Sequence, residues 1–122
     1  MEYSIGEFAN IVGLTAHTLR YYEKEGLLAT KRNRGGQRVY LEADLRWVEF
    51  IKRLKETGMP IRQIKTYAHY RAQGDKTMPA RVAMLATHRQ HILDEIDRWK
   101  EHLENMDRKI KFYEEVLSKK VA

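Results

Sequence analysis

The last third of the sequence carries a heptad repeat, and this feature limits what the chain can fold into more than any other. With Val82 taken as position a, apolar side chains fill the a and d positions as far as Leu117, and only Arg89 interrupts them. One helix over this stretch is roughly 50 Å long, because each residue adds about 1.5 Å. Nothing else in a chain of 122 residues could cover a stripe of that length. We therefore expect a second copy of the chain to cover it.

The predicted dimer interface consists of the apolar members of this repeat: Leu85, Ile92, Ile96, Trp99, Leu103, Met106, Ile110, Tyr113 and Leu117. Bulky Trp99 and Tyr113 at d positions suit an antiparallel or irregular pairing at least as well as a parallel zipper. The alternative is a helix that folds back on the chain's own N-terminal region.

A stretch near the N-terminus predicts two short helices joined by a turn at Gly13. Ser4 and Glu7 have the spacing of a capping box at the start of the first helix. Thr15 can cap the second helix, and Gly26 can end it in a left-handed conformation. The pattern is that of a helix-turn-helix.

The second of these helices turns Leu19 and Tyr22 inward and leaves small, hydroxyl-bearing, basic and aromatic side chains on its outer face. Such side chains suit a DNA major groove, where close backbone approach and contacts to phosphates and base edges are needed. A solvated face more often carries Glu and Lys. The predicted DNA contacts on this reading helix are Thr15, Ala16, His17, Thr18, Arg20 and Tyr21.

A basic segment follows. Residues 31 to 38 hold four cations and no acid, namely Lys31, Arg32, Arg34 and Arg38. Gly35 and Gly36 predict a hairpin tip between short strands at about 28 to 30 and 38 to 40. Next to a helix-turn-helix, such a wing is expected to grip phosphates. The alternative is a solvated linker.

Two further helices close the predicted N-terminal domain. An amphipathic pattern runs from Leu41 to Thr57, and Met59-Pro60 starts a fourth helix that stops near Gly74. We place the boundary within residues 74 to 77. The sequence thus predicts a DNA-binding domain over 1–75 and a dimerisation helix over 76–122.

The composition limits the classes of function that the chain can have. The formal net charge is +6 and the isoelectric point about 9.6, which favours a polyanionic partner. Residues 1–70 hold 12 Lys and Arg against 8 Asp and Glu, so most of the excess lies with the predicted reader. The chain has no cysteine, no membrane-spanning apolar run and no signal-peptide pattern. We expect a soluble cytoplasmic protein without a cofactor.

Catalytic and metal-binding patterns are weak. His88 and His91 lie one helical turn apart, but two ligands without a third make a poor metal site, and we interpret both as solvated. Asp94, Glu95 and Asp97 read as an exposed face. Because no nucleophile with a base, no phosphate loop and no metal constellation is evident, we do not expect an enzyme.

Three segments together resemble the MerR family of bacterial transcription regulators. They are Arg20-Tyr21-Tyr22-Glu23-Lys24-Glu25-Gly26-Leu27, the wing end Arg38-Val39-Tyr40 followed by Asp44-Leu45, and Phe50-Ile51-Lys52 through Gly58-Met59-Pro60. The resemblance implies a mainly α fold, with a winged helix-turn-helix domain followed by a long antiparallel coiled-coil dimerisation helix. It also implies a near-palindromic promoter element in double-stranded DNA. In the family, the dimer distorts an overlong promoter spacer so that RNA polymerase engages both promoter elements.

The resemblance also assigns site residues. It makes Ala16, His17 and Thr18 groove-facing and puts Arg20 and Tyr22 near the DNA backbone or base edges. In the wing, Arg32, Arg38 and Tyr40 match positions that grip phosphates, and we add Arg34 and Gln37 to this set. Two positions depart from the family pattern: Gln37 replaces a common tyrosine, and Leu41 replaces a common Ser or Thr helix cap.

The leading prediction is a homodimeric, sequence-specific transcription regulator. The alternatives are a coiled-coil adaptor and a non-specific architectural DNA-binding protein. Without cysteine, its signal cannot be a thiol reaction or a thiolate-bound metal. The remaining candidates for the signal are a small effector and the abundance of the protein. The residues that could line an effector pocket are Trp47, Tyr67, Tyr70 and Trp99, with core packing as the alternative.

Overall fold

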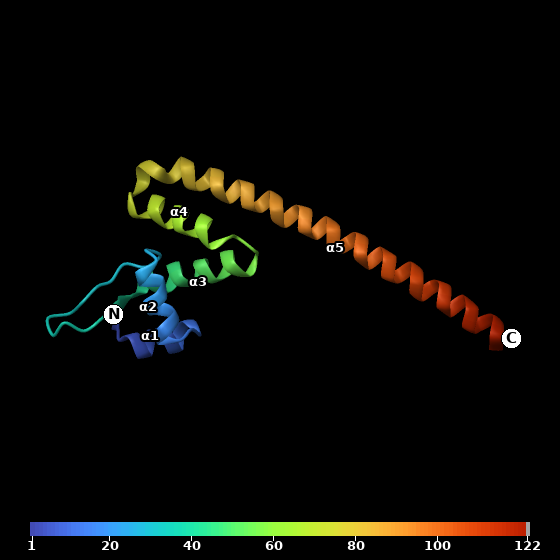
Figure 1. Ribbon diagram of the computed structural model, residues 1–122, viewed down its shortest axis with the longest axis horizontal. Coiled ribbons are helices and arrows are strands. Elements are labelled where there is room, and N and C mark those ends of the chain that lie inside the picture. The colour runs from blue at the N-terminus through green and yellow to red at the C-terminus, as the bar shows by residue number, and fades with distance from the viewer. Residues whose placement is uncertain (122) are drawn as a thin grey trace. The chain divides into compact units, whose positions relative to one another are not determined.

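The computed structural model describes residues 1–121 and is mainly helical. Its contacts divide it into two compact units, Met1–Met84 and a second from Leu85 onward, which are described separately. The elements, shown in Figure 1, are β1 (Glu2–Tyr3), α1 (Ile5–Val12), α2 (Ala16–Lys24), β2 (Tyr40–Leu41), α3 (Glu42–Glu56), α4 (Ile61–Ala72), the 3-10 helix η1 (Asp75–Thr77) and α5 (Met78–Val121). The unit boundary falls inside α5. Our functional division at residues 75 and 76 stays a prediction.

The caps of the helix-turn-helix are those that the sequence predicts. The Ser4 hydroxyl accepts a hydrogen bond from the Glu7 backbone N–H, and the Glu7 carboxylate accepts one from the Ser4 N–H. Gly13 ends α1 with φ 70°. The Thr15 hydroxyl caps α2 by accepting from the Thr18 N–H at 3.0 Å, and Gly26 follows α2 with φ 77°. Both glycines adopt the left-handed conformation that L side chains rarely tolerate.

The wing differs from its prediction. No strand forms at 28 to 30; Leu28 is buried in the core beside Leu27, and residues 29 and 30 are exposed and outside any strand. The hairpin lies further along: Arg32 and Arg38 form an antiparallel bridge, and the Gly35-Gly36 pair makes the tip of the long loop in Figure 1. The strand after it, β2, pairs antiparallel with β1. A partner strand of two residues leaves too short a pattern for the sequence to reveal.

The core of the N-terminal unit lies where its helices meet. Helix α1 packs on α2 and α3, and α3 packs on α4. At the start of α3, the side chain of Leu41 offers no acceptor, as its apolar nature predicts. The Asp44 carboxylate makes the reciprocal half of a capping box by accepting from the Leu41 N–H at 2.8 Å. The fully buried side chains are Phe8, Val12, Leu19, Tyr22, Tyr40, Val48, Ile51 and Ile64.

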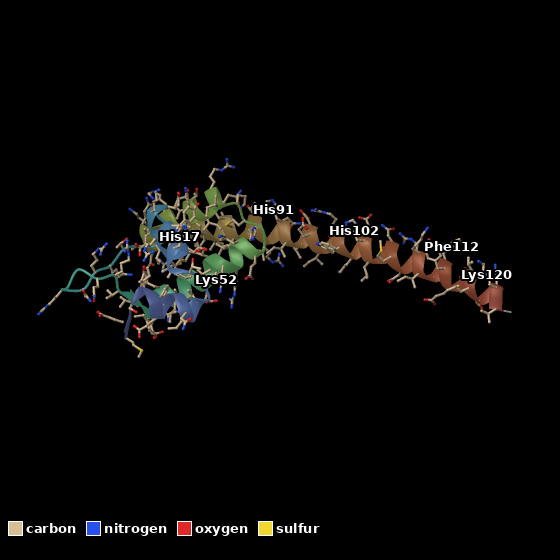
Figure 2. All side chains as sticks on the ribbon, turned by 60° about the horizontal axis from the view of Figure 1, so that its bottom comes forward. His17, Lys52, His91, His102, Phe112 and Lys120 are labelled. Atoms are coloured by element: carbon tan, nitrogen blue, oxygen red, sulfur yellow. The ribbon has the colours of Figure 1, made fainter. Side chains whose placement is uncertain are left out.

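Helix α5 has 44 residues and so extends for about 66 Å. Its predicted seam is exposed within the single chain from Ile96 onward, with Trp99 68% and Leu103 61% exposed, whereas the predicted seam residues Leu85 and Ile92 are half-buried. Side chains project from all its sides, among them His102 and Phe112 in Figure 2. One prediction is wrong here. His88 is buried, at 7% exposure, and not solvated.

Candidate nucleic-acid interface

The reading helix, α2, presents the outer face that its sequence predicts. Leu19 is fully buried, which turns His17, Arg20 and Tyr21 outward. Figure 2 labels His17 on this helix. Thr15 at the cap is exposed, whereas the neighbouring positions Ala16 and Thr18 are half-buried. The exposed set combines a hydroxyl, an imidazole, a guanidinium and a phenol, which are groups that contact phosphates and base edges.

Two residues of the predicted contact set belong to the core. Tyr22 and Tyr40 are each 1% exposed, so we correct the prediction of direct DNA contact for both side chains. Tyr40 stacks on Phe8 with ring centroids 4.5 Å apart. The Nζ of Lys55 lies 5.4 Å from the centroid of the Tyr22 ring. Both side chains therefore pack inside the domain.

A buried carboxylate joins the reading helix to the wing. Glu23 projects from α2 with 6% of its side chain exposed. It accepts a hydrogen bond from Arg38 Nε at 2.9 Å and another from the Thr30 hydroxyl at 3.1 Å. The Tyr40 hydroxyl donates a third. The residues at both ends of the wing are thus tied to one acid on α2.

The hydrogen bonds fix the protonation states of this cluster. Burial by itself raises the pKa of Glu23, but the hydrogen bonds from Tyr40, Arg38 and Thr30 outweigh it and leave that pKa below its ordinary value. The hydrogen bond to Glu23 raises the pKa of Arg38. Burial, followed by the same carboxylate, raises the pKa of Tyr40. Glu23 is consequently an anion that faces a cation and a neutral phenol.

A second acid holds the other arm of the wing. Lys31 Nζ donates to both oxygens of Asp44, at 2.9 and 3.1 Å. Asp44 is 5% exposed and lies on α3. Of the four wing cations, Lys31 and Arg38 are thus engaged by acids of the domain. Arg32 and Arg34 are exposed nearer the tip.

The wing tip is ordered by its own side chains. The side-chain oxygen of Asn33 accepts from the backbone N–H groups of Gly35 and Gln37, at 2.9 and 3.0 Å. Arg32 Nη1 donates to the carbonyl of Gly36 at 2.6 Å. Gln37 is exposed beside this turn. The tip therefore offers Arg34 and Gln37 to a ligand from a preformed loop.

Several residues that hold the reading helix and the wing in position were not identified from the sequence. Besides Glu23 and Asp44, Lys52 on α3 donates to the carbonyl of Val12 at 2.6 Å and so binds the end of α1. Trp47 Nε1 donates to the carbonyl of Leu27 at 2.6 Å. No local signal in the sequence singles out Glu23, because Glu25 lies two residues away in the same segment.

The aromatic residues proposed for an effector pocket include two core residues. Trp47 and Tyr67 are 5% and 8% exposed and stack with centroids 5.9 Å apart. The guanidinium of Arg71 lies 4.5 Å from the Trp47 ring centroid. Tyr70 is half-buried. For Trp47 and Tyr67, core packing thus accounts for the cluster.

Within residues 1–121, no group of three or more His, Asp or Glu side chains is arranged to hold a metal ion. No helix in the same range is long and apolar enough to cross a membrane.

Two family models match the chain. The MerR HTH family regulatory protein matches residues 3–71, and the MerR DNA-binding family matches residues 45–108. A transcriptional regulator of the HTH type from Haemophilus influenzae is 33% identical over 115 residues, covering 93% of this chain and 85% of that protein. The regulator AdhR of Bacillus subtilis is 41% identical over 92 residues, covering 75% of this chain and 66% of AdhR.

Solved structures agree with these matches. HiNmlR, a MerR family regulator lacking the sensor domain and bound to promoter DNA, is 33% identical with a TM-score of 0.82, covering 94% of this chain and 92% of that one. A MerR family regulator from Bacillus thuringiensis is 35% identical with a TM-score of 0.76, covering 90% of this chain and 97% of that one.

Proposed function

The chain belongs to the MerR family of helix-turn-helix transcription regulators, and from this membership we propose that it acts as a homodimer on a near-palindromic promoter element. Each copy places one reading helix and one wing on a half-site. DNA-binding regulation of transcription is the activity of the family, and its relatives here are regulators and not enzymes.

The observation that carries this proposal is the exposed face that α2 and the wing offer together. On α2 the proposed contacts are Thr15, Ala16, His17, Thr18, Arg20 and Tyr21. In the wing they are Arg32, Arg34, Gln37 and Arg38. Residues on the helix reach the groove and specify sequence, whereas the wing cations grip phosphates and fix the position of the protein.

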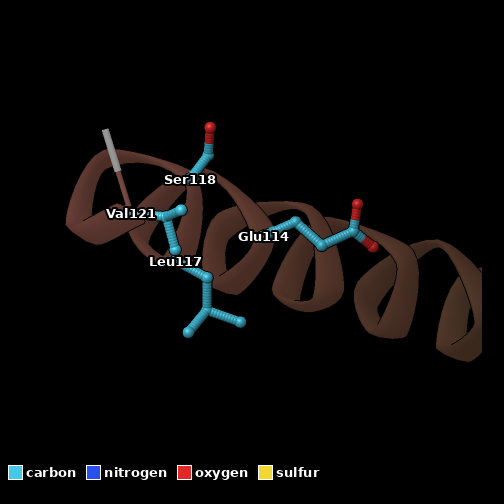
Figure 3. A pocket seen from close by; sticks show the side chains of 4 residues that line it. All are labelled: Glu114, Leu117, Ser118 and Val121. Atoms are coloured by element: carbon cyan, nitrogen blue, oxygen red, sulfur yellow. The ribbon is translucent and has the colours of Figure 1, made fainter.

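The homodimer is supported by the uncovered seam of α5. The seam residues from Ile96 to Leu117 are between 44% and 68% exposed, which is unusual for a helix that works alone. Near the C-terminal end, Leu117 and Val121 line a shallow apolar hollow beside Glu114 and Ser118 (Figure 3). A second α5, antiparallel to the first, is the proposed occupant of this face.

The proposed mechanism is regulation through DNA shape. Two reading heads at a fixed separation bind both half-sites only if the promoter spacer bends and untwists. That distortion would realign the promoter elements for RNA polymerase, which this chain then influences without touching it. The signal that switches the dimer is either a small effector or the abundance of the protein. Activity is expected to be indifferent to thiol reagents, because the chain has no cysteine.

The test is selection of duplexes from a random pool by the purified protein, followed by affinity measurements on the selected sequence. Two inverted half-sites should emerge, and affinity should fall steeply with added salt, because several Lys and Arg neutralise phosphates. Equal affinity for selected and scrambled duplexes would reject sequence-specific regulation and would favour architectural DNA binding. No binding to either duplex would favour an adaptor.

A further inference from the structure

The acid at the centre of the reading head lacks an evident purpose in a protein that binds a polyanion. Glu23 is ionised and lies on the reading helix itself. A carboxylate near DNA phosphates repels them, so on electrostatic grounds alone Glu23 weakens binding. Its three hydrogen bonds to Thr30, Arg38 and Tyr40 point to a different effect.

We infer that Glu23 is a positioning residue that strengthens DNA binding by clamping the wing to the reading helix. The inference rests on the proposed DNA-binding function and adds to it a residue that touches no DNA. Its side chain is 6% exposed. It acts through Arg38 and through the backbone on either side of the wing.

The geometry at Arg38 supports this role. Glu23 engages the guanidinium through Nε, which leaves the N–H groups on the two terminal nitrogens as further donors. The Arg38 side chain is 31% exposed. An arginine held by Nε has a fixed plane, so its terminal nitrogens meet a phosphate without first losing side-chain freedom.

The clamp also fixes both ends of the wing with respect to α2. Thr30 precedes the hairpin, and Arg38 and Tyr40 follow it, yet all three donate to the same carboxylate. Lys31 and Asp44 hold the adjacent arm to α3. If the clamp opens, the wing keeps its cations but loses its set distance from the reading helix. Simultaneous contact by helix and wing then costs ordering entropy.

Glu23→Gln separates the two effects because they have opposite signs. Removing a negative charge from a DNA-binding surface should raise affinity for every duplex. Loss of the clamp should lower affinity for the selected duplex by about tenfold, the scale of a charge-assisted hydrogen bond, while affinity for scrambled DNA stays level or rises. The inferred result is therefore a weaker specific complex in spite of one more net positive charge.

Two controls accompany this variant. Glu56→Gln makes the same charge change at an exposed position of α3, and it should leave the ratio of selected to scrambled affinity unchanged. Tyr40→Phe removes one hydroxyl that donates to Glu23 from a side chain that is 1% exposed. It should lower the specific affinity in the same sense as Glu23→Gln. Circular dichroism establishes that each variant is folded before its binding is measured.

The outcomes separate the inference from the function on which it rests. If the wild-type protein does not prefer its selected duplex, the proposed function fails. If the wild type does prefer it, but folded Glu23→Gln binds that duplex as tightly or more tightly, then Glu23 acts only as a charge and the inference is overturned. A specific loss in both Glu23→Gln and Tyr40→Phe, absent in Glu56→Gln, supports the clamp.

Discussion

The N-terminal unit and helix α5 differ in how far one copy of the chain buries their apolar side chains. In the N-terminal unit, Phe8, Leu19 and Ile51 are fully buried within one copy of the chain. On α5, Trp99, Leu103 and Leu117 remain more than 60% exposed. The first unit therefore has a core of its own, whereas the second exposes an apolar face that we propose a second copy covers. DNA binding by the N-terminal unit and dimerisation through α5 should accordingly be separable by substitution.

The largest expected effect is on assembly. Leu103→Asp places a charge on the proposed buried seam, which costs several kcal/mol unless the helices separate. Sedimentation should give a monomer whose N-terminal unit still unfolds cooperatively. Asn105→Asp makes the same charge change at an exposed position off the seam, so it is the matched control and should stay dimeric. A dimeric Leu103→Asp would place the interface elsewhere.

The converse substitution lies in the core of the N-terminal unit. Phe8 is fully buried and stacks on Tyr40, so Phe8→Ala should lower the free energy of unfolding of that unit by about 3–5 kcal/mol. Chemical denaturation followed by tryptophan fluorescence measures this, because Trp47 lies in the same core. Crosslinking should still detect the dimer under conditions where the unit is half unfolded. Loss of the dimer in step with the core would show that the two regions are not independent.

A smaller effect separates helix from wing within the reader. Arg34→Ala should weaken binding to all duplexes alike and reduce the salt dependence, because a phosphate contact carries no sequence information. His17→Ala should change the preference among half-site sequences by about 1–3 kcal/mol per base pair read. Competition binding on a panel of single-base variants distinguishes them. If both substitutions change only overall affinity, α2 is not the reading helix.

The smallest expected effect is the dependence of folding stability on pH. The pKa of Glu23 is lower in the folded chain than its ordinary 4.5, so the carboxylate stabilises the fold above that pH and loses this contribution as pH falls through the folded value. Wild-type stability should thus drop toward that of Glu23→Gln on acidification. Melting curves of the two proteins from pH 7 to pH 3 would test it, and a constant gap would contradict the assignment.

Local signals in the sequence were sufficient for the helices and their ends. The Ser4 and Glu7 pair, Thr15 and the glycines at 13 and 26 each act within a few residues, and each was predicted correctly. The contacts that place the wing join residues far apart in the chain. Glu23 with Arg38, Lys31 with Asp44, and β1 with β2 depend on tertiary packing, which local patterns do not encode.

Tyr22 and Tyr40 also show what a sequence resemblance alone does not determine. The helical pattern predicts that Tyr22 points inward, and the structure confirms it. The resemblance places Tyr22 and Tyr40 near DNA, but both side chains are only 1% exposed. A phenol whose ring packs against Phe8 cannot also face a groove. Packing therefore determines which side chains of the proposed binding surface are exposed.

The measurement that tests the central claim most directly compares affinity for the selected inverted pair of half-sites with affinity for one half-site. If two readers are held together by α5, wild-type protein should prefer the pair by a factor of about 100 or more. Leu103→Asp should bind one half-site as the wild type does and show no preference for the pair. A monomeric Leu103→Asp that retained the full preference would contradict the account, as would a wild-type dimer that bound both duplexes equally.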